Sequence, residues 1–268
     1  MRYFISLSFK GTSFSGWQHQ VNLSSVQDEV ERGLSILFGR KIPVTGAGRT
    51  DAGVHAVNYT AHFDLPAPLS DEDFPKLIYK MNAILSADIA VHEIYPVQPD
   101  AHARFDASGR TYRYFIHTKK SPFPDQYSYY FPYITDIDKM NQAANYLLGE
   151  HDFTSMAKLH SNVKSNICSV KEACWTPGSP VSILSVSDCD TEKMSHPESS
   201  YCFTITSNRF LRNMVRAVVG SLLEVGRGKQ EPEWIKEVLT HKNRCAAGSS
   251  VPAYPLFLVN IDYPENIF

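Results

Sequence analysis

Hydrophobic residues recur with two different periods along this chain of 268 residues. Every second residue is apolar over residues 1–9 and again over residues 57–63, which predicts a strand in each place. Apolar residues three and four apart over residues 26–37 and 138–148 predict amphipathic helices instead. The chain therefore mixes strands and helices along its length.

Local signals and weaker patterns predict the remaining elements. Residues 24–27 (Ser-Ser-Val-Gln) have the form of a capping box before the first helix. Gly149 suits the position after a helix, and Pro232 suits the first turn of one. The further predictions are helices over residues 69–85, 209–225 and 232–239, and strands over residues 42–44, 110–118, 183–186, 201–207 and 256–263.

The predicted elements follow the order strand, helix, strands, helix, and this order occurs roughly twice. Such an alternation predicts an α+β fold of two similar α/β halves around a largely antiparallel sheet. We set the N-terminal half at residues 1–105 and the C-terminal half at residues 106–268. Residues 177–200 are rich in Ser, Pro and Asp, and we expect a hairpin with a long tip there, without chemistry of its own.

The composition is that of an ordinary globular protein, with 43% hydrophobic and 20% charged residues. No apolar run approaches the roughly twenty residues that cross a membrane. The five cysteines form no Cys-x-x-Cys pair, which argues against a disulfide framework or a zinc site and favours a reducing cytoplasm. They are Cys168, Cys174, Cys189, Cys202 and Cys245.

Charge is nearly balanced overall, at a net -2, but basic residues gather in two segments. Residues 102–120 contain five Lys or Arg and one acid, and residues 209–229 have the same balance. Local basic patches on a near-neutral chain can follow a phosphate backbone. They can equally be two solvated surfaces, and the sequence leaves both interpretations open.

Residues 46–56, "GAGRTDAGVHA", combine three glycines with an arginine, an aspartate and a histidine. The third glycine of a dinucleotide fingerprint would fall at Asp51, and a phosphate-binding loop would need a lysine, so neither motif is present. Asp51 and His55 lack a third ligand, which argues against a metal site. Asp51 then either caps the backbone of its own turn or takes part in chemistry.

The segment "GRTDAGVHA" (residues 48–56) resembles the signature of the TruA-type tRNA pseudouridine synthases. Ser86, Ala101, Ser250 and Pro255 depart from the residues usual in that family, and these departures concern loop shape. Further segments are similar to the family and lie in its order: "SFSGWQHQ" (13–20), "SVQDEVERGL" (25–34), "ADIAV" (87–91), "HARFDA" (102–107), "RTYRY" (110–114), "GEHDFTS" (149–155), "FLRNMVRAVVGSLLEVG" (210–226) and "LFLVNIDY" (256–263).

The resemblance implies a pseudouridine synthase fold with the active-site cleft between the two halves. It implies an isomerase that converts uridine to pseudouridine at positions 38 to 40 of the tRNA anticodon stem-loop. The family needs no cofactor and no metal, and it forms homodimers that hold tRNA across both subunits. We therefore expect tRNA and a second copy of this chain as partners.

The resemblance also assigns roles to four residues. Breaking a glycosidic bond builds positive charge on the sugar, which a carboxylate can stabilise or attack. Asp51 is the catalytic residue by this comparison, and one carboxylate suffices because the leaving uracil has acidity of its own. Tyr112, Arg49 and Arg216 are assigned to substrate binding: stacking on the base, filling the space of an extruded base, and keeping Asp51 ionised.

Each of these roles has a plainer alternative. Tyr112 can be an ordinary aromatic on a sheet face, and His55 is best explained as a hydrogen bonder within the loop. Arg209, Arg212 and Arg216 are spaced to share one face of the predicted helix, where they can be merely solvated. On that face Gly220 would leave room for a ligand.

Two other classes of function compete with the synthase. A catalytically silent tRNA-binding protein of the same fold would be expected to lack Asp51 or Tyr112, and both are present. A nucleoside hydrolase or glycosidase would need paired carboxylates or an aspartate cluster, and the glycine segment has neither.

Overall fold

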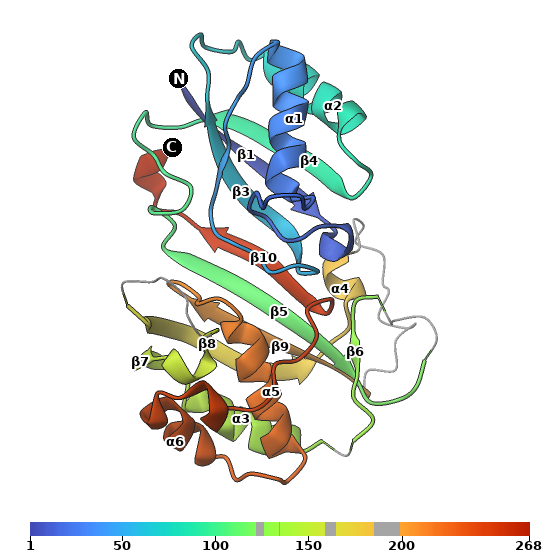
Figure 1. Ribbon diagram of the computed structural model, residues 1–268, viewed down its shortest axis with the longest axis vertical. Coiled ribbons are helices and arrows are strands. Elements are labelled where there is room, and N and C mark those ends of the chain that lie inside the picture. Colours follow the sequence, from blue (N-terminus) through green and yellow to red (C-terminus); the bar gives the residue numbers. More distant parts are fainter. Residues whose placement is uncertain (122–125, 134, 159–164, 185–198) are drawn as a thin grey trace. The chain divides into compact units, whose positions relative to one another are not determined.

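The computed structural model describes residues 1–268 except 122–125, 134, 159–164 and 185–198 (Figure 1). The chain divides into two compact units. The first unit comprises Met1–Gly109 and Leu258–Phe268, and the second unit comprises Arg110–Phe257. Each unit combines helices with mainly antiparallel strands, so the predicted α+β class is confirmed.

The first unit places two helices against a sheet of antiparallel strands. Strands β1 and β3 pair so that Ile5 lies opposite Ala61 and Leu7 opposite Tyr59, which brings the predicted apolar positions of both strands together. These side chains are fully buried. The strand order is β4-β1-β3-β10, and the elements are β1 (Arg2–Phe9), β2 (Thr45–Gly46), β3 (His55–Asp64), β4 (Ile89–Pro96), β10 (Leu256–Asp262), α1 (Val26–Phe38), α2 (Asp73–Ile84) and the 3-10 turns η1 (Gly11–Ser13) and η6 (Glu265–Ile267).

The second unit repeats the plan with other strands. Its strands follow the order β5-β9-β8-β7, and α3 and α5 pack together beside α6 (Figure 1). Helix α5 is buried along most of its length. The elements are β5 (Gly109–His117), β6 (Tyr129–Tyr130), β7 (Gly149–Asp152), β8 (Ile167–Pro177), β9 (Ser200–Ser207), α3 (Ile137–Asn145), α4 (Val181–Leu184), α5 (Met214–Gly226), α6 (Trp234–His241), η2 (Thr154–Met156) and η5 (Arg244–Ala246).

The start of α5 differs from the prediction. The helix begins at Met214, not at residue 209, because Asn213 adopts a left-handed conformation with φ of 67°. An amide from the next residue, Met214, closes a turn onto the carbonyl of Leu211 at 3.1 Å. Arg209 and Arg212 therefore precede the helix, and the predicted arginine face does not exist.

Two predicted strands are also wrong. The backbone of Val44 bonds to side chains of α1 instead of a neighbouring strand, with its amide on Glu31 at 3.0 Å and its carbonyl on Gln27 at 3.1 Å. Pro43 has no amide hydrogen to offer a strand partner. Ile183 lies in α4, so the described part of residues 183–186 is helical. The predicted hairpin of residues 177–200 falls largely outside the described residues.

Other boundaries shift by a few residues. Ser25, not Ser24, caps α1, since its hydroxyl accepts from the amide of Asp28 at 3.2 Å and donates to that carboxylate at 2.6 Å. Helix α2 begins at Asp73, α6 begins two residues after Pro232, and α3 ends before Gly149, which opens β7 with φ of 92°. Among the described residues, none of the helices has the length and hydrophobicity that would cross a membrane.

Candidate active site

The loop that carries Asp51 connects β2 to β3, as the sequence predicted, and the chain itself requires two of its glycines. A Cβ on Gly46 would lie 2.2 Å from the Tyr59 hydroxyl and 2.4 Å from Nε1 of Trp17. Gly53 has φ of 81°, a conformation that side chains disfavour. Gly48 differs, because a Cβ there would meet nothing within 4 Å.

Residues 11–17 pack against this loop and form hydrogen bonds to two of its side chains. The amide of Trp17 donates to Oγ1 of Thr50 at 3.1 Å, and the amide of Gly11 donates to Nδ1 of His55 at 3.1 Å. The carbonyl of Thr50 lies so close to Gly16 that a Cβ there would approach it to 2.3 Å. His55 is buried and holds the loop, as expected for a hydrogen bonder within it.

The braced loop presents Arg49 and Asp51 differently. Arg49 is exposed, Thr50 is buried, and Asp51 is half-buried between solvent and the core. The carbonyl of Asp51 accepts from the amide of Val54 at 3.1 Å, so a tight turn follows the carboxylate directly. The loop thus buries Thr50, whereas Arg49 on one side of it is exposed and Asp51 on the other is half-buried.

Tyr59 fixes the outer part of the loop. Its hydroxyl donates to the carbonyl of Gly48 and accepts from the Gly48 amide at 3.3 Å. Its ring stacks on Trp17 with centroids 4.1 Å apart. The sequence predicted no role for Trp17, Thr50 or Tyr59. For Tyr59 the signal was the alternation of apolar residues over residues 57–63.

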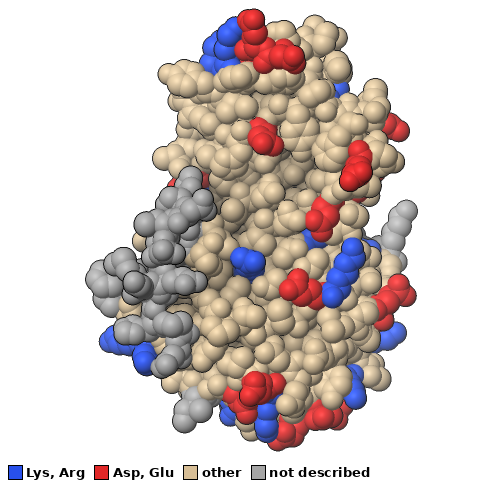
Figure 2. Space-filling view, turned by 180° about the vertical axis from the view of Figure 1, so that it is seen from behind, with Lys and Arg blue, Asp and Glu red and all other residues tan. Residues whose placement is uncertain are grey.

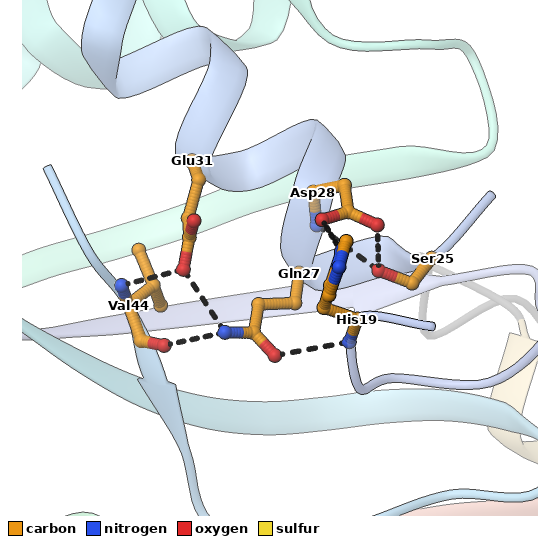
Figure 3. Close-up of polar contacts among 6 residues, drawn as sticks. All are labelled: His19, Ser25, Gln27, Asp28, Glu31 and Val44. Carbon is orange, nitrogen blue, oxygen red and sulfur yellow. Dashed lines mark hydrogen bonds and ion pairs between the residues drawn. The ribbon is translucent and has the colours of Figure 1, made fainter. Parts of the chain in front are cut away.

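The chain that leads into the loop is tied to α1 by side chains (Figure 3). Gln27 donates to the carbonyl of Val44 at 3.1 Å and to Glu31 at 2.9 Å, while Glu31 accepts the Val44 amide. The first turns of α1 therefore set the position of the strand β2 that precedes the loop of Asp51. These polar side chains on a helix face were not predicted as positioning residues.

In the second unit, Tyr112 lies in the middle of β5, paired with Ile205 of β9. Its half-buried ring meets Phe210 edge-on, with centroids 5.0 Å apart and an interplanar angle of 83°. Tyr114 is fully buried, and its hydroxyl donates to the carbonyl of Pro252 at 3.1 Å. Burial raises the pKa of Tyr114 far above its ordinary value, so this phenol keeps its proton.

Arg216 lies in the first turn of α5 and is half-buried. Its Nε donates to the carbonyl of Val251 at 2.7 Å, and the amide of Val251 donates back to the Arg216 carbonyl at 3.2 Å. Gly220, predicted to leave room for a ligand, instead accommodates the chain's own backbone, because a Cβ there would lie 1.8 Å from the carbonyl oxygen of Ser249.

The four sequence-predicted residues are divided between the two units. Arg49 and Asp51 share one loop of the first unit, while Tyr112 and Arg216 belong to the second unit. Within the described part of the chain, no three His, Cys, Asp or Glu side chains cluster as metal ligands would.

The predicted basic segments are partly neutralised. Arg110 donates to the carbonyl of Asn208 at 2.7 Å. In the second segment Arg227 and Lys229 both pair with Glu224, at 3.5 Å and 3.1 Å. On the face shown in Figure 2, charges of both signs are scattered among neutral residues, and neither sign dominates.

Comparison with known proteins agrees with this arrangement. The family described as tRNA pseudouridine synthase matches residues 143–264. A Bacteroides thetaiotaomicron protein is 48% identical over 267 residues, covering 100% of this chain and 92% of its own. Relatives from Parabacteroides distasonis and Bacillus subtilis are 46% and 38% identical, over 100% and 98% of this chain and 98% and 99% of theirs. All three bear the name tRNA pseudouridine synthase A, and at such identity along its whole length this chain belongs to the tRNA pseudouridine synthase A family.

Proposed function

We propose that this chain is an isomerase that converts uridine to pseudouridine in tRNA. The observation that carries the proposal is the loop of Asp51, which is braced by contacts from Trp17 and Tyr59 while Asp51 itself stays half-buried. Family membership along the whole chain supports the same function. Both Asp51 and Tyr112 are present, and nothing in the described part of the chain favours a catalytically silent protein.

The proposed reaction rearranges one nucleotide without a cofactor. The bond between uracil N1 and the sugar C1′ breaks, a bond between uracil C5 and C1′ forms, and the C5 proton is lost while N1 gains one. Asp51 supplies the carboxylate that stabilises the sugar cation or bonds to it. A second acid is unnecessary because the leaving uracil accepts the electron pair of the broken bond.

Three residues are proposed to bind the substrate. Tyr112 stacks on the uracil, and the edge-on contact with Phe210 holds its ring in one orientation. Arg49, exposed on the loop, occupies the space of the extruded base, since the target must leave its stack. Arg216 is the third of these residues, and its guanidinium is held at the start of α5 by the Val251 carbonyl.

Finer parts of the proposal concern the target and the assembly. We propose uridines at positions 38 to 40 of the anticodon stem-loop, a homodimer that holds tRNA across both subunits, and a place in the cytoplasm. The N-terminal half carries the aspartate loop, and the C-terminal half carries Tyr112 and the helix of Arg216. The free thiols of Cys168, Cys174, Cys202 and Cys245 accord with a reducing compartment.

The test is to incubate the purified chain with unmodified tRNA and map pseudouridine by position. We expect pseudouridine at one or more of positions 38 to 40 without added cofactor. Folded tRNA that remains unmodified, with wild-type protein shown to bind it, would overturn the enzymatic function and leave the silent RNA-binding alternative.

A further inference from the structure

A short loop next to the loop of Asp51, residues 18–24, is exposed to solvent along its whole length. Two residues of this tip are aliphatic, with 79% of Val21 and 51% of Leu23 accessible. A single exposed apolar residue is common, but two on one short loop are typical of a surface that binds another molecule.

Hydrogen bonds hold the tip in a fixed conformation. At its base the amide of Ser15 donates to the carbonyl of Ser24 at 2.8 Å. Along its length Gln20 donates to the Ser15 carbonyl at 2.7 Å, and Asn22 adopts a left-handed φ of 63°. The tip is therefore preorganised, which lowers the entropy lost when it binds a partner.

Contacts with α1 fix the tip as a whole (Figure 3). Nδ1 of His19 lies 2.7 Å from a carboxylate oxygen of Asp28, and the His19 amide donates to Gln27 at 3.2 Å. The same Gln27 holds Val44, in the segment that leads to the catalytic loop. One side chain thus sets the tip and the approach to Asp51 relative to each other.

The base of the tip also touches the catalytic loop directly. Trp17, the residue before the tip, donates its amide to Thr50, and Gly16 packs against the Thr50 carbonyl. Thr50 is the neighbour of Asp51 in the chain. An RNA strand whose uridine reaches Asp51 must therefore pass close to residues 18–24.

The chemistry of the tip indicates which part of an RNA it contacts. Residues 18–24 contain no Lys, Arg, Asp or Glu, so the tip offers no strong contact to a phosphate. They offer aliphatic side chains and the amides of Gln18, Gln20 and Asn22, which suit base faces and base edges. Bases beside an extruded nucleotide lose a stacking partner and expose apolar surface.

We propose that residues 18–24 dock on the tRNA strand beside the target uridine, with Val21 and Leu23 packed against the bases that flank it. This inference rests on the proposed function, because it takes tRNA as the substrate. It adds an uncharged contact to a substrate-binding set that otherwise relies on arginines and Tyr112.

The experiment replaces Val21 and Leu23 together by Ser and compares the variant with Ile36→Ser. Ile36 is a matched control because it is an aliphatic side chain of α1 that is 56% exposed. Affinity for unmodified tRNA is measured at several salt concentrations, with pseudouridine formation, thermal unfolding and molar mass on the same preparations. We expect the double variant to bind about tenfold more weakly. Its salt slope should match wild type, and Ile36→Ser should leave affinity unchanged.

Each outcome decides between specific alternatives. Wild-type affinity in the double variant, with wild-type protein forming pseudouridine, overturns the tip as an RNA contact and leaves the enzymatic function standing. A lower molar mass in the double variant shows that the tip contacts another protein chain, which also overturns the proposal. A wild-type protein that forms no pseudouridine overturns the proposed function itself.

Discussion

The loop of Asp51 and the first turn of α5 each hold a charged residue half-buried, but by different means. The loop is fixed by side chains bonded to backbone, through Thr50, His55 and Tyr59. The turn that carries Arg216 is held by one bond between backbones, from the Val251 amide to the Arg216 carbonyl, and by one bond from the Arg216 side chain itself to the Val251 carbonyl. The loop around Asp51 therefore depends on the identity of neighbouring side chains, whereas the position of Arg216 depends on its own side chain and on the path of the backbone at Val251.

Glycines show the same contrast. In the loop, Gly48 has open space at its Cβ position, so nothing within the described chain requires a glycine there. Beneath Arg216, Gly220 allows the backbone of Ser249 to approach. The first glycine faces a position that a substrate can occupy, while the second closes a contact within the fold.

The largest expected effect comes from Asp51→Asn. This change removes the carboxylate but keeps its size, and the glycines and Tyr59 still set the path of the loop. We expect pseudouridine formation to fall by at least about a thousandfold. Thermal unfolding and tRNA affinity should stay near wild type, because the bonds of Thr50, His55 and Tyr59 that brace the loop remain and asparagine keeps the size and polarity of the side chain. Near-normal yield would make Asp51 only a turn residue, and lost folding would make it structural.

The glycine contrast predicts opposite results for two alanine variants. Gly220→Ala places a methyl group 1.8 Å from the Ser249 carbonyl, which backbone must move to relieve. We expect the free energy of unfolding to fall by about 3 kcal/mol. Gly48→Ala should leave that free energy nearly unchanged but weaken tRNA binding, since its methyl group points into open space. Denaturant unfolding and tRNA affinity of both variants, measured together, check the pair. Equal loss of stability in both would contradict the comparison.

Acid should destabilise the first unit, because a buried imidazole there accepts a hydrogen bond and must lose it when it is protonated. Nδ1 of His62 accepts the amide of Ala103 at 3.1 Å, and burial, Arg2 and His102 lower the pKa of His62 to about 4. Asp64 and Asp106 oppose this shift. As the pH falls, His62 is protonated in the unfolded state before it is protonated in the folded state. Its contribution to the free energy of unfolding is therefore complete above about pH 6.5 and is lost as the pH drops toward 4, by about 3 kcal/mol at most.

The matched variant for this prediction is His62→Asn, whose side-chain oxygen can accept the same amide without titrating. Unfolding free energy between pH 7.5 and 4 should fall less steeply in this variant than in wild type. Parallel pH profiles for the two proteins would show that His62 is not the group that titrates.

Local sequence patterns predicted the loop of Asp51 better than the first turn of α5, which carries Arg216. Alternating apolar residues predicted β1 and β3, and the start of β3 marked where the loop of Asp51 ends. The first turn of α5 was misjudged because the left-handed Asn213 gives no periodic signal, and helical spacing continued through it. Val251 and Ser249 act on Arg216 and Gly220 from far along the chain, and no local pattern reports such contacts. The roles of Trp17 and Thr50 were missed for the same reason.

The smallest effects come from two tyrosine hydroxyls, one at each site. Tyr59→Phe removes the donor to the Gly48 carbonyl and the acceptor of its amide, while the ring keeps its stack on Trp17. Tyr114→Phe removes one bond, to the carbonyl of Pro252. We expect each change to lower the free energy of unfolding by about 1 to 2 kcal/mol, at about 1 kcal/mol for each bond lost. Thermal unfolding of both variants measures this loss.

Activity should distinguish the two variants although their stabilities are similar. Without the Tyr59 hydroxyl, the backbone of Gly48 loses one bond at its amide and one at its carbonyl, so the segment before Arg49 and Asp51 gains freedom. Without the Tyr114 hydroxyl, Val251 next to Pro252 still keeps both of its bonds to Arg216. We expect Tyr59→Phe to slow single-turnover pseudouridine formation about tenfold, and Tyr114→Phe about twofold or less. Equal rates in the two variants would mean that the loop of Asp51 holds its shape without its side-chain bonds, and the distinction between the sites would then be wrong.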